Sequence, residues 1–253
     1  MSLTVTNVLH AAESTHWYTK GGTPAYMILG KNGKLRPTTL RDARLKGYVP
    51  SVTTIIGAAA KPALEKWKQE QVLLAALTLP RMPNEPEQEW LVRVMADSRE
   101  QGKRAADEGT NIHASIEGFY AGLGLGKYPD HVKGLESALA VKFGVQEWIA
   151  EKSFASQMGF GGKVDLCAPG FVVDIKTKEF TADKLPEAYD DHLMQLAAYR
   201  EGLGMPKARC ANVFVSRNVA GLVHVVEWEE NDLIKGTKMF VGLLDYWYAK
   251  TQL

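Results

Sequence analysis

The stretch "GFGGKVDLCAPGFVVDIKTKEF", residues 159–180, places two acidic residues inside apolar runs. Asp165 and Asp174 each have valine, leucine or isoleucine neighbours, and Lys176 follows the second aspartate. The "APG" between them predicts a tight turn that joins two antiparallel strands. In such a pair both aspartates come to one edge of the sheet. Lys176 shares the face of Asp174, because residues two apart in a strand point the same way.

Two carboxylates held close together repel each other, and this repulsion raises their pKa values. A divalent cation relieves the repulsion, and hard oxygen ligands suit Mg²⁺ or Mn²⁺. Lys176 on the same face could orient a water molecule and stabilise the transition state of phosphodiester hydrolysis. The alternative is that Asp165 and Asp174 only cap turns at strand ends, since Asp-x-Lys is a common chance pattern.

Composition bounds the class of protein. The 253 residues fit one large domain or two small ones, and 45% of them are apolar, enough for a core. A net charge of +1 gives no indication of a polyanionic partner. The chain has two cysteines, too few for a four-cysteine zinc or iron–sulfur site or for a disulfide framework. We find no signal peptide and no membrane span, so we expect an intracellular protein.

The order of predicted elements favours an α/β fold. Helices are predicted over residues 85–122 and 130–145. Three β-like runs follow, "VQEWIAEKSFAS", "GGKVDLCA" and "FVVDIKT", separated by glycine and proline signals. A helix over about 186–203, the strands "CANVFVSR" and "LVHVVEW", and an amphipathic helix complete the chain. We therefore predict a mixed sheet flanked by helices, with a mainly helical N-terminal part packed on it.

Residues 31–47 concentrate positive charge in an otherwise neutral chain. They contain one acid, Asp42, and six basic residues: Lys31, Lys34, Arg36, Arg41, Arg44 and Lys46. This segment is either a solvated surface or a surface that grips phosphate groups near the cleft.

Four motifs in a fixed order resemble the PD-(D/E)xK nuclease superfamily, RecB-type branch. They are Gly109-x-x-x-His113, Gly162-Lys163-Val164-Asp165, Asp174-Ile175-Lys176-Thr177, and Gln195-x-x-x-Tyr199 on a predicted helix. "VPSVTTIIG", residues 49–57, further resembles phage exonucleases related to the mitochondrial genome maintenance exonuclease. The resemblance implies a restriction-endonuclease-like α/β core in one nuclease domain. Its expected parts are a variable segment 1–47, a mainly helical part 48–150 and a catalytic part 151–253.

The resemblance also implies roles for individual residues. Asp165 and Asp174 would be the metal ligands, joined by the Ile175 carbonyl and His113, and Lys176 would be the catalytic lysine. Gln195 and Tyr199 would line the site, although both could be ordinary helix-interface residues. Thr177, Lys178 and Arg217 would contact substrate. Glu117 could support the ligands or be a plain surface glutamate, and Glu151, on the strand before Asp165, could reach the site as a further support.

The function implied by the resemblance is a metal-dependent DNA exonuclease of phage recombination, replication or repair. It would use Mg²⁺ or Mn²⁺, no iron–sulfur cluster and no ATP. Its partners would be DNA, single-stranded or with free ends, and a recombination or replication protein. It would act in the cytoplasm of a bacterium or phage-infected host, without a membrane. The alternatives are a flap or branch endonuclease, and a catalytically weak binding module of the same fold.

Overall fold

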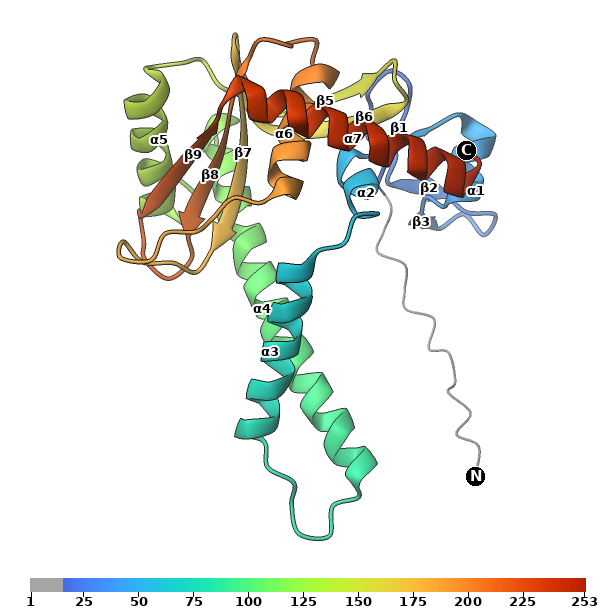
Figure 1. Ribbon diagram of the computed structural model, residues 1–253, viewed down its shortest axis with the longest axis vertical. Helices are drawn as coiled ribbons and strands as arrows, with labels where there is room; N and C mark the ends of the chain where they lie inside the picture. The colour runs from blue at the N-terminus through green and yellow to red at the C-terminus, as the bar shows by residue number, and fades with distance from the viewer. Residues whose placement is uncertain (1–15) are drawn as a thin grey trace.

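A computed structural model describes residues 16–253, and the predicted α/β fold is confirmed (Figure 1). Its centre is a five-stranded mixed sheet in the order β5-β6-β7-β8-β9. The strands are β5 (Ile149–Ser156), β6 (Phe160–Ala168), β7 (Phe171–Lys178), β8 (Arg209–Ser216) and β9 (Val223–Trp228). Each neighbouring pair is antiparallel except β7 and β8, which run parallel. Residues 1–15 of the predicted variable segment lie outside the described residues.

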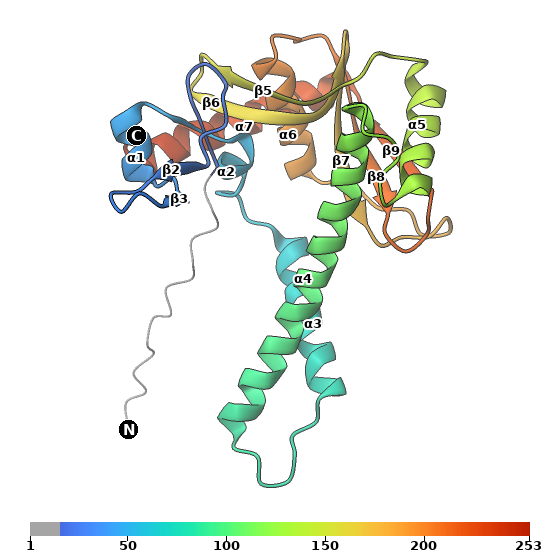
Figure 2. The same cartoon turned by 180° about the vertical axis from the view of Figure 1, so that it is seen from behind.

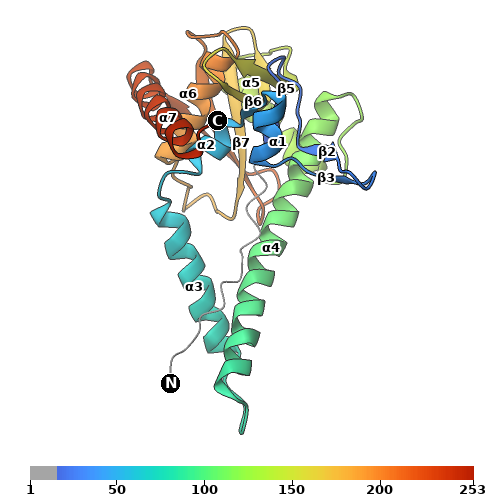
Figure 3. The ribbon, with the colours of Figure 1, turned by 90° about the vertical axis from the view of Figure 1, so that its right-hand side faces the viewer.

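Helices cover both faces of the sheet, which explains why its strands are apolar on both sides. The helices α6 (Asp190–Gly202) and α7 (Glu230–Thr251) pack on one face, and α6 is the crossover that makes β7 and β8 parallel. The C-terminal half of α4 (Glu87–Tyr120) and α5 (Pro129–Phe143) cover the other face, as Figure 3 shows with the sheet between the two layers. Two hydrophobic cores result, one on each side.

The segment before the sheet forms small elements that pack beside β6. They are β1 (Trp17–Tyr18), β2 (Met27–Leu29), β3 (Leu35–Pro37), α1 (Leu40–Lys46), β4 (Val49–Pro50) and α2 (Val52–Ile56). Ser51 begins α2 as predicted, because its hydroxyl accepts a hydrogen bond of 3.0 Å from the Thr54 amide. Figures 1 and 2 place α1 and the β2–β3 hairpin beside the C-terminal end of α7.

The most prominent feature of the outline is a long helical arm. It consists of α3 (Pro62–Thr78) and the first half of α4, joined by a short loop (Figures 1–3). The arm projects away from the sheet, while the second half of α4 continues into the body and carries His113. Among residues 16–253, no helix is both long and apolar enough to cross a membrane.

Candidate active site

The alternation of side chains along β6 is interrupted at Asp165. Val164 packs in the core under α6 and α7, whereas Leu166 packs in the core on the α4 and α5 side. Residues two apart in a regular strand share a face. Val164 and Leu166 do not, so β6 is irregular between them. On the neighbouring strand, Glu151 would be opposite Asp165, and its φ of 57° lies in the left-handed region. Such a conformation is unusual for glutamate and marks local strain beside the aspartate.

Pairing between β6 and β7 also ends at this point. The ladder runs from Ala168–Phe171 to Leu166–Val173, and the next pair in the same register would be Asp165 with Asp174. In place of a backbone bond, Oδ2 of Asp165 accepts a hydrogen bond of 2.6 Å from the Ile175 amide. The strands therefore separate where the two aspartates meet, and groups from both faces of the sheet can reach the opening.

The charges of the two aspartates affect each other. Burial and, next, the Asp174 carboxylate together raise the pKa of Asp165 to about 7, although Lys176 opposes the shift. Burial lowers the pKa of Lys176, but the carboxylates of Asp174 and Asp165 outweigh burial, so the net shift is upward. Lys176 is therefore held as a charged ammonium.

Lys176 is fixed by two side chains on the α6 face of the sheet. Its Nζ lies 2.9 Å from Oδ1 and 2.8 Å from Oδ2 of Asp174, and it donates a 2.9 Å hydrogen bond to Oε1 of Gln195. Gln195 in turn donates from Nε2 to the Tyr199 hydroxyl at 2.9 Å. The two residues predicted to line the site thus form one network with the lysine. Gly162 makes room for Tyr199, because a Cβ there would lie 2.9 Å from the tyrosine ring.

Asn212 belongs to this network, although none of the sequence motifs includes it. It is fully buried on β8, in register with Asp174, and donates from Nδ2 to Oδ2 of Asp174 at 2.8 Å. Its own Oδ1 accepts a 2.7 Å hydrogen bond from the Trp228 indole. A single amide within the apolar run "CANVFVS" was the available signal, because a buried polar group needs a partner.

Helix α4 crosses β7 closely and brings His113 to the opening. A Cβ at Gly109 would lie 2.5 Å from Oγ1 of Thr177, so only glycine permits this approach. Burial lowers the pKa of His113, and the nearby Asp174 carboxylate opposes that shift. Glu117, one turn further along α4, is exposed and close enough to raise the pKa of His113 slightly. The glycine of this motif is therefore a packing requirement, and the histidine lies beside the carboxylates.

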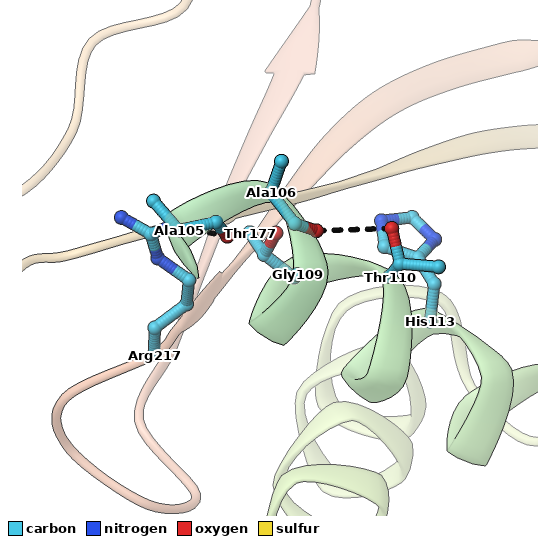
Figure 4. Close-up of a pocket in the computed structure, with 7 residues that line it drawn as sticks. All are labelled: Ala105, Ala106, Gly109, Thr110, His113, Thr177 and Arg217. Atoms are coloured by element: carbon cyan, nitrogen blue, oxygen red, sulfur yellow. Dashed lines mark hydrogen bonds between the residues drawn. The ribbon is translucent and has the colours of Figure 1, made fainter. Parts of the chain in front are cut away.

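A cavity of about 380 Å³ opens beside His113 (Figure 4). It is bounded on one side by α4, through Gly109 and Thr110, and on the other by Thr177 and Arg217. Arg217 donates a 2.6 Å hydrogen bond to the Ala105 carbonyl and pairs with Glu179 at 3.2 Å. Arg217 therefore joins α4 to the sheet, and it lines the cavity together with Thr177, another residue predicted to contact substrate.

Lys178 lies over two aromatic rings. Its Nζ lies 4.5 Å from the centre of the Tyr189 ring and 5.2 Å from that of Phe214. Burial lowers the pKa of Lys178. His192, which had no predicted role, packs against the same rings. Burial, with Lys176 nearby, lowers the pKa of His192 to about 4, so this imidazole is neutral at neutral pH.

Two predicted elements lie apart from the network. Glu151 forms an ion pair with Lys163, so its contact with the aspartates is indirect. In the basic segment, Arg36 forms a bidentate pair with Asp42 at 2.6 and 2.8 Å, and Arg44 donates to the Thr251 carbonyl. Figures 1 and 2 place α1 at the far end of α7 from β7, so these cations do not line the cavity. A role of the segment in gripping phosphate stays a prediction.

The donor groups fit a hard divalent cation in their chemistry. Two carboxylates, the Ile175 carbonyl and the His113 imidazole are ligands that Mg²⁺ or Mn²⁺ accepts. Within residues 16–253, however, no three His, Cys, Asp or Glu side chains come together closely enough to hold an ion as they stand. The positive charge beside these carboxylates is the Lys176 ammonium, whose Nζ lies 2.8 Å from Oδ2 of Asp174. Asp165 and Asp174 are therefore the pair that would hold the ion.

Comparison with known proteins gives little beyond this geometry. No protein-family model and no curated protein matches the chain. Among solved structures, a candidate exonuclease from Eubacterium rectale is similar at 14% identity, covering 53% of this chain and 63% of that one, with a TM-score of 0.36. The protein SSO0001 is similar at 16% identity, covering 71% and 85% of the two chains, with a TM-score of 0.26. At such low TM-scores neither similarity indicates a function.

Proposed function

We propose that this protein is a metal-dependent deoxyribonuclease that degrades DNA from its ends. The observation that supports it is the joint placement of Asp165, Asp174 and Lys176 where β6 and β7 separate. Burying charges in a sheet is costly, and apolar residues of similar size would stabilise the fold as well or better. Three such charges at one opening, beside a cavity, fit a catalytic site better than a structural one.

Each residue has a physical role in this proposal. Asp165 and Asp174 hold the cation, which when bound supplies Lewis-acid stabilisation and a more acidic water. Lys176 stays charged and can donate a hydrogen bond to a phosphoryl oxygen as negative charge develops there. Gln195 keeps the ammonium in position from α6, and Asn212 fixes the rotation of the Asp174 carboxylate. The cavity next to His113 is open to the substrate backbone.

Action at ends is supported by the similarity of residues 49–57 to phage exonucleases. The alternative, an endonuclease that cuts at flaps or branches, shares the same site chemistry. Linear single-stranded DNA labelled at either end, beside a circle of the same sequence, separates the two. We expect the linear strand to be degraded with Mg²⁺ or Mn²⁺ and the circle to remain intact. Cleavage of the circle would favour the endonuclease.

The test of the catalytic assignment uses Asp174→Asn and Lys176→Ala. Each change should lower the cleavage rate on the order of 10²–10³-fold or more, while DNA binding persists. Lys152→Ala is the control, because Lys152 is an exposed lysine on β5 of the same sheet. Activity above a tenth of wild type in either site variant would contradict the assignment. So would full activity in excess EDTA.

A further inference from the structure

The outer half of the helical arm exposes an unusual number of large apolar side chains. We call this the arm patch, and its members are 38–79% exposed: Leu73, Leu74, Leu77, Met82, Leu91, Val92 and Met95. All belong to the C-terminal half of α3, the joining loop or the first turns of α4. Soluble monomers rarely gather so much apolar surface in one place, and such patches usually mark an interaction site.

The arm has almost no core of its own. In α3, apart from Ala63, whose side chain is not described, the only buried residue is Ala75. In the described part of α4 before Gly109, the buried residues are Val94 and Ser98. Helices in water owe most of their stability to the packing of an apolar face, which two helices alone supply poorly here.

Side-chain contacts nevertheless join the two helices at the tip of the arm. The Trp90 indole donates a 2.7 Å hydrogen bond to the Leu79 carbonyl, and Arg93 pairs with Glu85 at 2.9 Å. The two helices are therefore held in register at the tip. The apolar outer surface of such a helical hairpin is suited to packing against another helical element.

An exposed stripe of residues on α4 carries charges that indicate which helical element would pack there. Glu89, Val92, Ala96, Arg99 and Lys103 follow each other at spacings of three and four, and all five are exposed. Glu89 and Lys103 each lie seven residues from Ala96, on opposite sides. None of the three charged residues forms an ion pair with another described residue. The stripe is thus acidic at its outer end, small and apolar at its centre, and basic at its inner end.

A stripe with this order is complementary to itself in antiparallel orientation. We propose that the occupant of the arm patch is a second copy of this chain. Its arm would lie antiparallel to the first across a two-fold axis near Ala96. Glu89 of each copy would then face Lys103 of the other, and the two hairpins would form a four-helix bundle. A parallel arrangement would set Glu89 against Glu89 and is disfavoured by charge.

The size of the patch agrees with a stable pair. Aromatic side chains bury about 150–250 Å² each, and with the lower end of that range for the smaller leucine, valine and methionine the arm patch offers on the order of 600 Å². A standard protein interface takes about 800 Å² from each partner. The small side chain of Ala96 at the crossing allows the helices to approach. The catalytic bodies would lie at opposite ends of the bundle, since each sits at the base of its own arm.

Oligomeric state tests the proposal without reference to nuclease activity. Sedimentation velocity of the full chain over a range of concentrations should show a dimer. Leu77→Glu with Ala96→Glu should weaken association by about tenfold or more, because the two-fold axis near Ala96 brings the two added carboxylates there face to face. Val141→Glu is the matched control: Val141 is 87% exposed on α5, away from the arm, and should leave the dimer intact. Circular dichroism confirms that each variant is folded.

A charge exchange tests the antiparallel orientation. Glu89→Lys alone should weaken the dimer, since Lys would face Lys103, and adding Lys103→Glu should restore it. A wild-type chain that stays monomeric at the highest concentrations reached would overturn the proposal. It would also be overturned by a dimer unaffected by Leu77→Glu with Ala96→Glu. A monomer that binds lipid vesicles through the patch would assign the surface to a membrane instead.

Discussion

Asn212 on β8 donates a 2.8 Å hydrogen bond to Asp174, its register partner on β7. The Asn212 amide is itself oriented by the Trp228 indole at 2.7 Å. The direction of the Asp174 carboxylate therefore depends on two strands that carry no part of the recognised motif. Lys176 contacts both oxygens of the same carboxylate, at 2.9 and 2.8 Å. Loss of either support should allow Asp174 to turn.

The first prediction concerns Asn212→Ala. Outer partners that orient a ligand typically contribute 10–100-fold to metal affinity or activity, and we expect a loss of about that size here. Mn²⁺ affinity by calorimetry and the single-turnover cleavage rate measure it. Trp228→Phe keeps the ring but removes the N–H donor, so it should cause a smaller loss. Unchanged metal affinity and rate in Asn212→Ala would show that Lys176 alone orients the carboxylate.

The second prediction concerns Gln195→Leu, which keeps the volume of the side chain but removes the acceptor for Lys176. A misplaced catalytic group can cost up to about 10²-fold, so kcat should fall while KM stays near the wild-type value. Tyr199→Phe removes only the hydroxyl that accepts from Gln195, and its effect should be weaker. If Gln195→Leu raises KM and leaves kcat unchanged, Gln195 binds substrate and does not position the lysine.

The third prediction tests why α4 has glycine where it crosses β7. Gly109→Ala places a methyl group against Oγ1 of Thr177 and should destabilise the fold by about 1–3 kcal/mol. Thr177→Ala removes the obstructing oxygen, so the double variant should recover most of the loss in urea unfolding. Gly118→Ala is the control on the same helix. Its Cβ would meet Leu123 at 3.8 Å, an ordinary contact, and the substitution should be neutral or stabilising.

Additive effects of Gly109→Ala and Thr177→Ala would show that the two positions do not touch. The helix would then tolerate a larger residue by a small shift. Cleavage should also fall in Gly109→Ala, because displacement of α4 moves His113, and Thr177→Ala should restore part of it unless Thr177 itself binds substrate.

The fourth prediction concerns pH. Glu227 on β9 accepts from Arg209 at 2.6 Å and pairs with Lys142 of α5 at 2.9 Å, and these partners lower its pKa from 4.5 to about 2. A carboxyl whose pKa is depressed by folding stabilises the fold above its unfolded pKa. That stabilisation is lost as pH falls through the folded value. Glu227→Gln should therefore be less stable than wild type at pH 7, by about 1 kcal/mol or less.

The difference between Glu227→Gln and wild type should narrow as the pH falls below the ordinary glutamate pKa. Thermal unfolding between neutral pH and about pH 3 measures it. Glu147→Gln, at an exposed loop glutamate, should show no comparable change. A stability difference between Glu227→Gln and wild type that stays constant with pH would mean that the substitution acts through packing and not through charge.

The sequence predicted the sheet and its helices because their signals are local. Apolar alternation, the "APG" turn and helical spacing each act over a few residues, and every predicted strand from β5 to β9 is present. Ser51 was identified as a cap for the same reason. Asp174 and Lys176 share a face because they are two apart in a strand, and Gln195 and Tyr199 share a face because they are four apart in a helix.

Only the tertiary structure decided which distant groups meet. Asn212 reaches Asp174 through parallel pairing across a crossover helix, and no spacing in the chain encodes that register. The charge of the basic segment, residues 31–47, suggested a place near the cleft. Its helix α1 instead lies beside the C-terminal end of α7. The arm patch has apolar residues at helical spacing that predict burial. Whether such residues become core or surface depends on what packs against them, and within one chain nothing covers the described arm patch.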